Sequence, residues 1–222
     1  MRNYFITGTD TDSGKTLITC ALMVKMKEAG FSVNAMKPIA AGISILDEGN
    51  LNEDVVMLHR YASMEVDYRL MNPYLFEPAI APHLAAKDIG VVIESNIIKE
   101  AYEELLQQAD VTLVEGAGGW LVPLSKDLDV GDMPTLLSLP VILVVGLKLG
   151  CINHTRLTIN VMRSQGVEFS GWIGTQVEKN MSALQGNIDS LKEIIDVPCL
   201  GIVPFDKNID ASKAAQYLTL PA

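Results

Sequence analysis

The sequence predicts an α/β fold in which a mostly parallel central sheet, flanked by helices, forms the middle layer of a three-layer sandwich. Two observations support this prediction. Short apolar runs typical of buried strands alternate along the chain with segments whose apolar residues recur at helical spacing. The run Pro140–Val145 is apolar throughout, as expected for a central parallel strand that is covered on both faces. Crossovers between the parallel strands are expected to be right-handed, and because every candidate residue lies just past the carboxyl end of a strand, we expect the ligand to bind at that edge of the sheet.

The composition is that of one domain, and it excludes two classes of partner. The 222 residues fit a single domain, 1–222, in which 49% of residues are hydrophobic and 20% are charged. The formal net charge is −10 and the 17 lysines and arginines do not cluster, so we expect no nucleic-acid partner. The longest apolar run, Leu139–Leu147, contains Pro140 and is far shorter than a membrane span, so we expect no membrane partner.

Two further features favour a cytoplasmic location. No charged and apolar leader typical of a secretory signal precedes the first predicted strand. The cysteines are odd in number and far apart, which fits neither a disulfide framework nor the paired spacing of a zinc site: Cys20, Cys151 and Cys199. A reducing compartment is the simplest explanation.

The first predicted strand and helix enclose a candidate phosphate-binding loop. A β-rich run, Tyr4–Thr7, leads into Gly8–Thr16 (Gly-Thr-Asp-Thr-Asp-Ser-Gly-Lys-Thr), and a helical pattern follows from Leu17 to Met26. In such a loop the backbone N–H groups and the helix N-terminus are directed at phosphate oxygens. Lys15 would reach the β- and γ-phosphates, and the Thr16 hydroxyl would bind Mg²⁺.

The loop departs by one residue from the standard pattern G-x-x-x-x-G-K-[ST]. That pattern requires glycine at position 9, where this chain has Thr9, and its first glycine is Gly8 instead. The alternative is a strand-to-helix turn that ends in Gly-Lys-Thr by chance. The strand before the loop and the helix after it favour a phosphate site.

The second predicted strand, Phe31–Met36, ends at Lys37, which therefore lies at the ligand-binding edge of the sheet. A solvated lysine at a strand end is the alternative, but the neighbouring phosphate loop favours a cation that acts on the ligand. Residues 39–52 are expected to form a loop before a helix that begins at Asn52. Asp54 lies in its first turn, where it could complement the helix dipole or bind a metal ion, and both roles remain open.

Residues 71–83 contain three prolines and are expected to be extended, until a short helix starts at Pro82. His83 has no partner at metal-ligand spacing, so we interpret it as a structural or surface histidine. An amphipathic helix is predicted over Glu94–Ala109, with apolar residues on one side.

The next strand, Val111–Val114, ends in a second acidic candidate, Glu115. A carboxylate that closes an apolar strand resembles the Walker B carboxylate, which reaches the Mg²⁺ shell held by the loop threonine. The glycines that follow, within Gly116–Gly119, allow the backbone to approach a ligand closely. A strand-end charge before a flexible turn is the alternative.

The second half of the chain continues the alternation of strands and helices. Asn153 precedes a predicted helix, His154–Ser164, where it could cap the helix or mark a second anion site. The tail from Lys207 is polar and only weakly patterned. The remaining elements are a loop at 120–133, strands at 140–145, 169–177 and 198–203, and a helix that follows Met181 and reaches Ile195.

Taken together, four stretches of the chain resemble the dethiobiotin synthetase family: Gly8–Thr16, Lys37-Pro38, Glu115–Trp120 and Val144–His154. The resemblance runs from Tyr4 to about Pro204. The phosphate loop alone is shared by many ATPases, but the other stretches, in this order, are far more specific. The resemblance implies a P-loop NTPase-like fold and a homodimeric, cytoplasmic, Mg²⁺- and ATP-dependent enzyme of biotin synthesis.

The resemblance also implies a reaction. The family closes the ureido ring of dethiobiotin from 7,8-diaminononanoate and CO₂ (or bicarbonate) and releases ADP and phosphate. A carbamate forms at one amine and attacks the γ-phosphoryl group, and the second amine then displaces phosphate from the mixed anhydride.

The resemblance assigns residues of this chain to each part of that reaction. Lys15, Lys37 and Thr11 are implied to be catalytic: Lys15 neutralises charge on the phosphates, and the other two hold the carbamate near the γ-phosphate. Mg²⁺ is implied to be held by Thr16, Asp54 and Glu115. The implied ATP-binding residues are Asp12, Ser13, Gly14, Lys15, Thr16, Leu17, Asp54, Glu115, Gly116, Ala117, Gly118, Thr175, Gln176, Pro204, Phe205 and Asp206. The implied substrate-binding residues are Thr11, Lys37, Ala41, Lys148, Gly150, Cys151 and Asn153. In the family, the helix start that corresponds to Gly150–Asn153 is donated across the dimer.

The chain departs from the family at four places. Asp12 replaces a common glutamate, and Ala41 replaces a common serine. Thr175-Gln176 stands where the family often has Asn-Asp to read adenine, and Pro204-Phe205-Asp206 stands in place of Pro-Trp-Leu. Because a threonine hydroxyl cannot reproduce the paired donor and acceptor of an amide, we expect weak discrimination between ATP and other triphosphates.

Three other functions are compatible with a phosphate loop. The ATPase half of a cobyrinic acid amidase belongs to a longer chain with a glutamine amidotransferase domain, for which 222 residues leave no room. A partition ATPase of the Mrp/MinD type carries an extra lysine early in the loop, where this chain has Asp10. A nucleotide-binding subunit without chemistry would need neither Lys37 nor Asp54.

Overall fold

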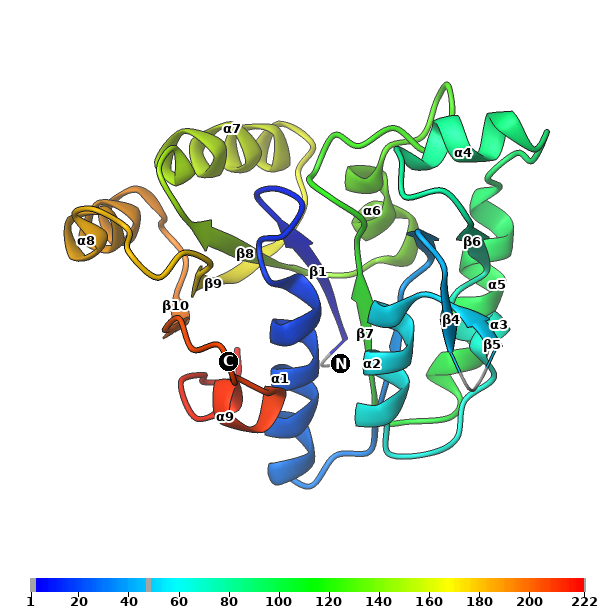
Figure 1. The fold of residues 1–222 in the computed structure, drawn as a ribbon, viewed down its shortest axis with the longest axis horizontal. Coiled ribbons are helices and arrows are strands. Elements are labelled where there is room, and N and C mark those ends of the chain that lie inside the picture. Colours follow the sequence, from blue (N-terminus) through cyan, green and yellow to red (C-terminus); the bar gives the residue numbers. More distant parts are fainter. Residues whose placement is uncertain (1–2, 47–48, 222) are drawn as a thin grey trace.

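The computed structural model describes residues 3–46 and 49–221, and its central feature is a six-stranded parallel sheet (Figure 1). The strand order is β10-β9-β8-β1-β7-β2. The strands span Tyr4–Gly8 (β1), Val33–Met36 (β2), Val111–Glu115 (β7), Val141–Leu147 (β8), Phe169–Gln176 (β9) and Cys199–Val203 (β10). This architecture confirms the predicted α/β sandwich with a mostly parallel sheet.

The three central strands are the most apolar, because helices cover both of their faces. Every residue of β1, β7 and β8 is buried. Along β8 the side chains alternate between two clusters: Leu143 and Val145 pack with α7 and α8, whereas Ile142 and Val144 join the main core. The continuous apolar run at 141–145 is therefore explained by burial on both sides.

The long helices follow the strands in the predicted order. They are α1 (Lys15–Glu28), α2 (Glu53–Tyr61), α5 (Ser95–Leu106), α7 (Cys151–Ser164) and α8 (Leu184–Ile194). Helix α1 contacts β1, β2 and β7, and its other neighbours are α2 and the C-terminal helix α9 (Ala211–Ala215). Helices α7 and α8 lie together over β8 and β9 (Figure 1).

Several short elements were not predicted. The region expected to be a loop at 39–52 contains β3 (Ile39–Ala41), β4 (Ser44–Leu46) and β5 (Gly49–Leu51), and its residues 47–48 lie outside the described part of the chain. Strand β3 pairs in parallel with β6 (Tyr74–Phe76), which lies in the segment expected to be extended, and β4 pairs antiparallel with β5. The other short elements are α3 (Tyr68–Met71), α4 (Pro82–Asp88, as predicted from Pro82), a 3₁₀ turn at Val130–Asp132 and α6 (Met133–Leu137).

The weakly patterned tail from Lys207 contains structure that the sequence interpretation did not predict. Its helix α9 buries Ala211, Ala214 and Ala215, and it packs against α1. Beyond the helix, Leu218 bridges Gly201 of the edge strand β10, and the Thr219 N–H donates to the Leu200 carbonyl at 2.8 Å. The small side chains that made the tail weakly patterned are what allow this close packing.

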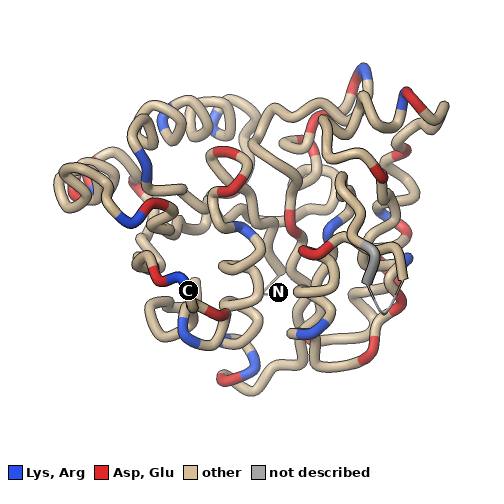
Figure 2. The backbone as a smooth tube through the Cα atoms, in the orientation of Figure 1, with Lys and Arg blue, Asp and Glu red and all other residues tan. Residues whose placement is uncertain are grey.

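Charged residues of both signs are interspersed over the elements (Figure 2), in agreement with the scattered lysines and arginines of the sequence. Within residues 3–46 and 49–221, none of the helices has the length and apolar character needed to cross a bilayer.

Candidate active site

The loop Gly8–Thr16 connects β1 to α1 at the carboxyl edge of the sheet, as predicted. A side chain at Gly8 would place its Cβ 2.2 Å from the Ser13 hydroxyl oxygen, so the loop closes on itself and needs glycine at position 8. Gly14 has φ +89° and precedes the helix without a side-chain cap. The N–H groups at the start of α1 are therefore left for a ligand, as a phosphate-binding loop requires.

Lys15 is folded back over this loop. Its ammonium donates a 2.9 Å hydrogen bond to the Asp10 carbonyl. Burial lowers the pKa of Lys15, although the nearby Glu115 carboxylate opposes that shift. The lysine is thus a buried cation beside the open helix start, which suits it to phosphate oxygens.

The second cation, Lys37, meets both acidic candidates. Its ammonium lies 2.5 Å from Asp54 Oδ2 and 2.7 Å from Glu115 Oε1. The Thr16 hydroxyl donates to the same Glu115 oxygen at 2.8 Å. Four residues from four different elements or their ends, α1, β2, α2 and β7, therefore converge on one point.

The backbone around these side chains explains their positions. The Lys37 N–H donates to the Met71 carbonyl at 2.8 Å, and the buried Asn72 amide donates to the Lys37 carbonyl at 2.7 Å. Asn52 caps α2 by accepting from the Asp54 N–H at 3.1 Å. Asp54 therefore lies in the first turn of the helix as expected, but its carboxylate pairs with Lys37.

The electrostatics of this cluster favour the charged forms of its members. Burial opposes the charge of Lys37, which is 6% exposed, but Glu115 and Asp54 outweigh it and raise the pKa of the lysine. Burial likewise opposes the charge of Asp54, but Lys37 outweighs it and lowers the pKa of that carboxyl. Lys37 and Asp54 therefore favour each other's charged form.

The oxygen atoms of the cluster fit a hard divalent cation. Two carboxylates and one hydroxyl are the donor types that Mg²⁺ prefers. Glu115 is completely buried, and among the described residues nothing donates to its Oε2. A buried carboxylate oxygen without a partner is costly unless a ligand satisfies it, so Thr16, Asp54 and Glu115 fit Mg²⁺.

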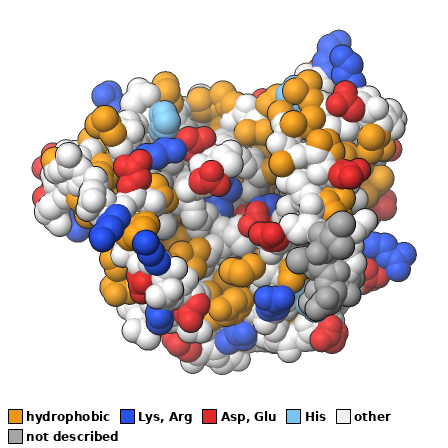
Figure 3. Space-filling model, in the orientation of Figure 1, with side chains coloured by type: hydrophobic (Ala, Val, Ile, Leu, Met, Phe, Trp, Pro, Cys, Tyr) orange, Lys and Arg blue, Asp and Glu red, His pale blue; other side chains and the backbone are white. Residues whose placement is uncertain are grey.

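Two cavities meet at Lys37. The first, about 370 Å³ and here called the phosphate cavity, is lined by the loop residues Thr11, Asp12, Gly14, Lys15, Thr16 and Leu17 together with Lys37, Asp54 and Gly118. The second, about 460 Å³ and here called the acceptor cavity, shares Thr11, Lys37, Asp54 and Gly118 with it. On the face drawn in Figure 3 the surface is hollowed near its middle, with acidic side chains at the rim.

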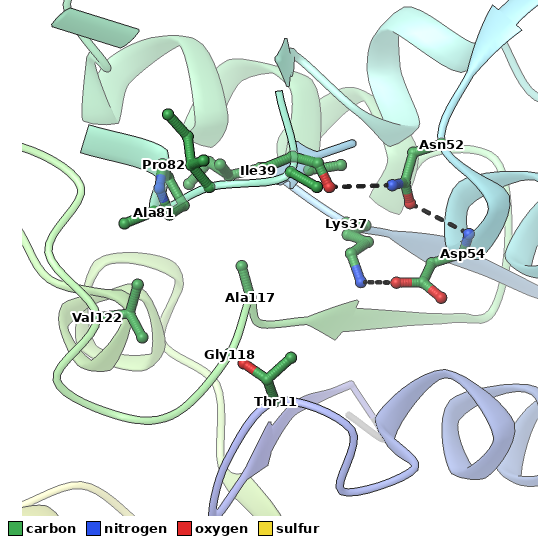
Figure 4. A pocket seen from close by; sticks show the side chains of 14 residues that line it. Thr11, Lys37, Ile39, Asn52, Asp54, Ala81, Pro82, Ala117, Gly118 and Val122 are labelled. Atoms are coloured by element: carbon green, nitrogen blue, oxygen red, sulfur yellow. Dashed lines mark hydrogen bonds and ion pairs between the residues drawn. The ribbon is translucent and has the colours of Figure 1, made fainter. Parts of the chain in front are cut away.

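The acceptor cavity has one polar wall and one apolar wall (Figure 4). Lys37 and Asp54 lie on the polar wall, and Asn52 ties that wall to the Gly42 carbonyl by a 2.8 Å hydrogen bond. Thr11 and Ala117 approach from the opposite side. The apolar lining consists of Ile39, Ala40, Ala41, Ala79, Ile80, Ala81, Pro82 and Val122. Such a cavity suits a ligand that has a polar end and an alkyl chain.

The residues predicted to read the nucleobase are held by the protein itself. Thr175 is 5% exposed, and a Cβ built on Gly14 would lie 2.8 Å from its methyl group, so it packs beneath the phosphate loop. The Gln176 amide donates to the Glu178 and Lys179 carbonyls at 3.0 and 3.2 Å, and its oxygen accepts from the Phe205 N–H at 3.3 Å. Gln176 therefore ties the end of β9 to the segment Pro204–Asp206, and its amide is engaged at both ends.

The predicted substrate residues at the start of α7 lie apart from both cavities. Lys148 forms an ion pair with Asp10, at 3.0 Å between Nζ and Oδ2. The helix begins at Cys151, which is buried, and Gly150 with φ +94° is its N-cap. The prediction that Asn153 caps this helix is wrong, because Asn153 already lies inside its first turn; a glycine in a left-handed turn begins the helix three residues earlier. None of Lys148, Gly150, Cys151 and Asn153 appears in the described lining of either cavity.

The sequence interpretation missed two residues of the site. Asn52 was seen only as the start of a helix, although an asparagine before two acidic residues is itself a capping signal. Asp10 was mentioned only because partition ATPases have a lysine at that position of the loop. Its pairing with Lys148 is long-range, and no local pattern indicates it.

The chain is similar to known families over nearly its whole length. The AAA domain family matches residues 2–213. The chain is 40% identical over 218 residues to the ATP-dependent dethiobiotin synthetase BioD of Xanthomonas euvesicatoria, covering 98% of this chain and 97% of that one. It is 41% identical over 220 residues to the protein of the same name from Aromatoleum aromaticum, covering 99% and 98%.

Solved structures resemble the chain in fold. The septum site-determining protein MinD of Pyrococcus horikoshii, complexed with Mg-ADP, has a TM-score of 0.58 at 19% identity and is covered to 92%, with 97% of this chain. The cell division ATPase MinD of Pyrococcus furiosus has a TM-score of 0.57 at 15% identity, with 97% of this chain and 95% of that one covered. At such identities the likeness concerns the fold, which is that of P-loop NTPases.

Proposed function

This chain belongs to the dethiobiotin synthetase family and is an ATP-dependent ligase, and from that premise we propose that it closes the ureido ring of dethiobiotin. The proposed substrates are 7,8-diaminononanoate, CO₂ (or bicarbonate) and ATP, and the products include ADP and phosphate. The observation that carries the proposal is the position of Lys37 at the junction of the phosphate and acceptor cavities.

The phosphate cavity is suited to the triphosphate. The N–H groups at the start of α1 and the Lys15 ammonium would bind phosphate oxygens, and Thr16, Asp54 and Glu115 would hold Mg²⁺. When bound, Mg²⁺ would neutralise negative charge on the β- and γ-phosphates. Leu17 and Asp12 line the same cavity and would contact the remainder of the nucleotide.

The acceptor cavity is suited to the carbamylated diamine. The carbamate at one amine would lie beside Lys37 and the Thr11 hydroxyl, which orient it toward the γ-phosphoryl group. Lys37 would act as a cation beside the carbamate, and its charged form is already favoured in the ligand-free protein, where Glu115 and Asp54 raise its pKa. The second amine would then displace phosphate from the mixed anhydride and close the ring.

The alkyl chain of the diamine would lie along the apolar wall. Ala41 lines this wall and offers a methyl group where relatives in the family offer a hydroxyl. Lys37 is the only lysine or arginine in the described lining of the acceptor cavity. The carboxylate at the other end of diaminononanoate would therefore need a second source of positive charge or of N–H groups. We propose that the start of α7 in the partner subunit of a homodimer supplies it, with Gly150, Cys151, Asn153 and Lys148.

The proposal is tested by mass detection of the cyclic urea. Wild-type protein is incubated with diaminononanoate, bicarbonate, ATP and Mg²⁺, and each component is omitted in turn. The expected result is a product that requires all four. ADP release without diamine would instead indicate a partition-type ATPase, and nucleotide binding without ADP release would indicate a non-catalytic subunit.

The location of the reaction is proposed to be the cytoplasm, in keeping with three separated, unpaired cysteines.

A further inference from the structure

The ammonium of Lys37 lies among the oxygens that suit a divalent cation. It contacts Asp54 and Glu115 at 2.5 and 2.7 Å, and Thr16 donates to the same Glu115 oxygen. In Figure 4 the side chain extends directly toward the Asp54 carboxylate. Lys37 is almost completely buried, and its ammonium contacts both carboxylates in the ligand-free protein.

A divalent cation on the same two carboxylates would lie close to the Lys37 ammonium. Glu115 Oε2 has no partner among the described residues, but the ammonium holds Oε1 of the same carboxylate and Oδ2 of Asp54, so a Mg²⁺ ion that binds both carboxylates at about 2.0–2.1 Å would lie within several ångströms of it. Glu115 is buried, which strengthens the repulsion between the two positive charges at that separation. We therefore expect binding of a divalent cation by Asp54 and Glu115 to displace the Lys37 ammonium from its present position.

The structure provides a place for the displaced ammonium. Lys37 also lines the acceptor cavity of about 460 Å³, whose described lining contains no residue of α1. A lysine carries its charge on a flexible stem of four carbons, so the ammonium can turn while the backbone stays fixed. The carbonyl and N–H of Lys37 remain held by Asn72 and Met71.

We propose that Lys37 is a place-holding cation, which neutralises the two carboxylates in the empty protein and turns into the acceptor cavity when a divalent cation takes its place. The identity of that cation rests on the proposed function. The arrangement couples two events: the lysine becomes available to an anionic acceptor only after the metal–nucleotide has loaded. An acceptor that arrives first would find Lys37 already paired.

The test measures binding of Mn²⁺ alone to the nucleotide-free protein, by electron paramagnetic resonance of the free ion. Lys37→Met removes the competing cation and is expected to bind Mn²⁺ at least about tenfold more tightly than wild type. Lys37→Arg keeps a cation at the site and is expected to bind no more tightly than wild type. Lys25→Met, which removes a surface lysine paired with Glu28, controls for the loss of one positive charge.

Thermal unfolding gives a second readout that does not depend on activity. Without divalent ions, Lys37→Met leaves two carboxylates without their cation and should melt below wild type. Addition of Mn²⁺ should raise its melting temperature by more than it raises that of wild type. If the variant folds only in Mn²⁺ and unfolds on chelation, the proposal is supported; if it fails to fold under both conditions, the proposal is rejected.

Equal or weaker Mn²⁺ binding by Lys37→Met also rejects the exchange. This outcome is separable from the ring-closing function, because product formation is measured independently on the wild-type protein. If the wild-type protein makes the cyclic urea but Lys37→Met binds Mn²⁺ no more tightly than wild type, the ring-closing function stands and the place-holding role is rejected.

Discussion

The Thr16 hydroxyl donates a 2.8 Å hydrogen bond to Glu115 Oε1, although the two residues are 99 positions apart. The parallel pairing of β1 with β7 brings them together, since Ile6 of β1 is in register with Glu115. This contact joins the start of the phosphate-loop helix to the acidic end of a neighbouring strand. It underlies the first prediction.

Glu115→Gln should weaken the binding of Mg²⁺, so that the enzyme needs a higher Mg²⁺ concentration. The amide keeps the shape of the side chain but removes the charge that would attract the ion, and it leaves Lys37 with one carboxylate. We expect the Mg²⁺ concentration for half-maximal product formation to rise about tenfold or more, with a loss of kcat. Glu104→Gln, on the exposed side of α5, is the matched control. An unchanged Mg²⁺ curve would contradict the assignment.

Lys37→Met should abolish chemistry while it preserves nucleotide binding. The lysine lies at the junction of the two cavities, so its removal affects the acceptor in the transition state. We expect product formation to fall by about 10²–10³, the cost of losing one preorganised charged donor. Nucleotide affinity, measured without divalent ions, should change only a few-fold.

Lys15→Met is the comparison variant for Lys37, because Lys15 lies over the phosphate loop alone. Its nucleotide affinity, measured by calorimetry with a non-hydrolysable ATP analogue, should fall strongly. If the two variants lose nucleotide affinity equally, Lys37 belongs to the nucleotide site and the role given to it is wrong.

Thr175→Asn should sharpen the preference for ATP. In the wild-type protein the Thr175 hydroxyl has no hydrogen-bond partner among the described residues, and the Gln176 amide is bonded to backbone at both ends, so Gln176 is not free to read a base. An asparagine adds a donor and an acceptor at position 175. The ratios of kcat/KM for ATP over GTP and over CTP should therefore rise in the variant. Ratios identical to those of wild type across the three nucleotides would reject this explanation.

Gly14→Ala should impair the phosphate loop more than it impairs folding. Gly14 has φ +89°, and an added Cβ would approach the Thr175 methyl to 2.8 Å. Gly30→Ala is a close match, because Gly30 has φ +90° and nothing within 4 Å of the added atom. Both variants should lose about 1–2 kcal/mol for the left-handed conformation. Only Gly14→Ala should also lose nucleotide affinity, as measured by calorimetry.

Asp110→Asn should reduce stability at neutral pH and have less effect in acid. The Ser32 hydroxyl and N–H donate to Asp110 Oδ2 at 2.6 and 2.9 Å and lower the pKa of that carboxyl. Because the pKa of Asp110 is lower in the folded state, its stabilisation is complete above the pKa of the unfolded chain, about 3.9. The stabilisation is lost as the pH falls through the pKa of the folded state. The melting temperatures of wild type and variant should differ at pH 7 and converge as the pH falls through the lowered pKa of Asp110 in the folded protein. A difference that persists in acid would point to packing instead.

The fold was predictable from the sequence where periodicity is long. The six sheet strands and the five long helices each carry an apolar pattern of their own, so they were found with boundary errors of a few residues. The short elements β3 to β6, α3, α6 and α9 have three to five residues each. Segments of that length have no stable local preference and are fixed by the residues that pack on them.

The candidate site was predictable to the extent that it lies at strand ends. Lys37 and Glu115 follow apolar strands, and the carboxyl edge of a parallel sheet brings such residues together. The family resemblance placed Asp54 with Glu115 at a Mg²⁺ site, but the ion pair between Lys37 and Asp54 was not predicted, because it depends on where α2 lies relative to β2. The apolar wall at Ala79–Pro82 was missed for a similar reason: a proline-rich segment without periodicity gives no indication of what it faces.

The contact between α9 and α1 links the far end of the chain to its catalytic beginning. Lys15 and Thr16 lie on the first turn of α1, and Ala211 and Ala214 are buried by the packing between α9 and that helix. At Gly201 an added Cβ would lie 2.2 Å from the Tyr217 carbonyl, so the segment after α9 rests directly on edge strand β10. Removal of residues 211–221 would therefore expose the face of α1 that α9 covers and leave β10 without the segment that lies against it.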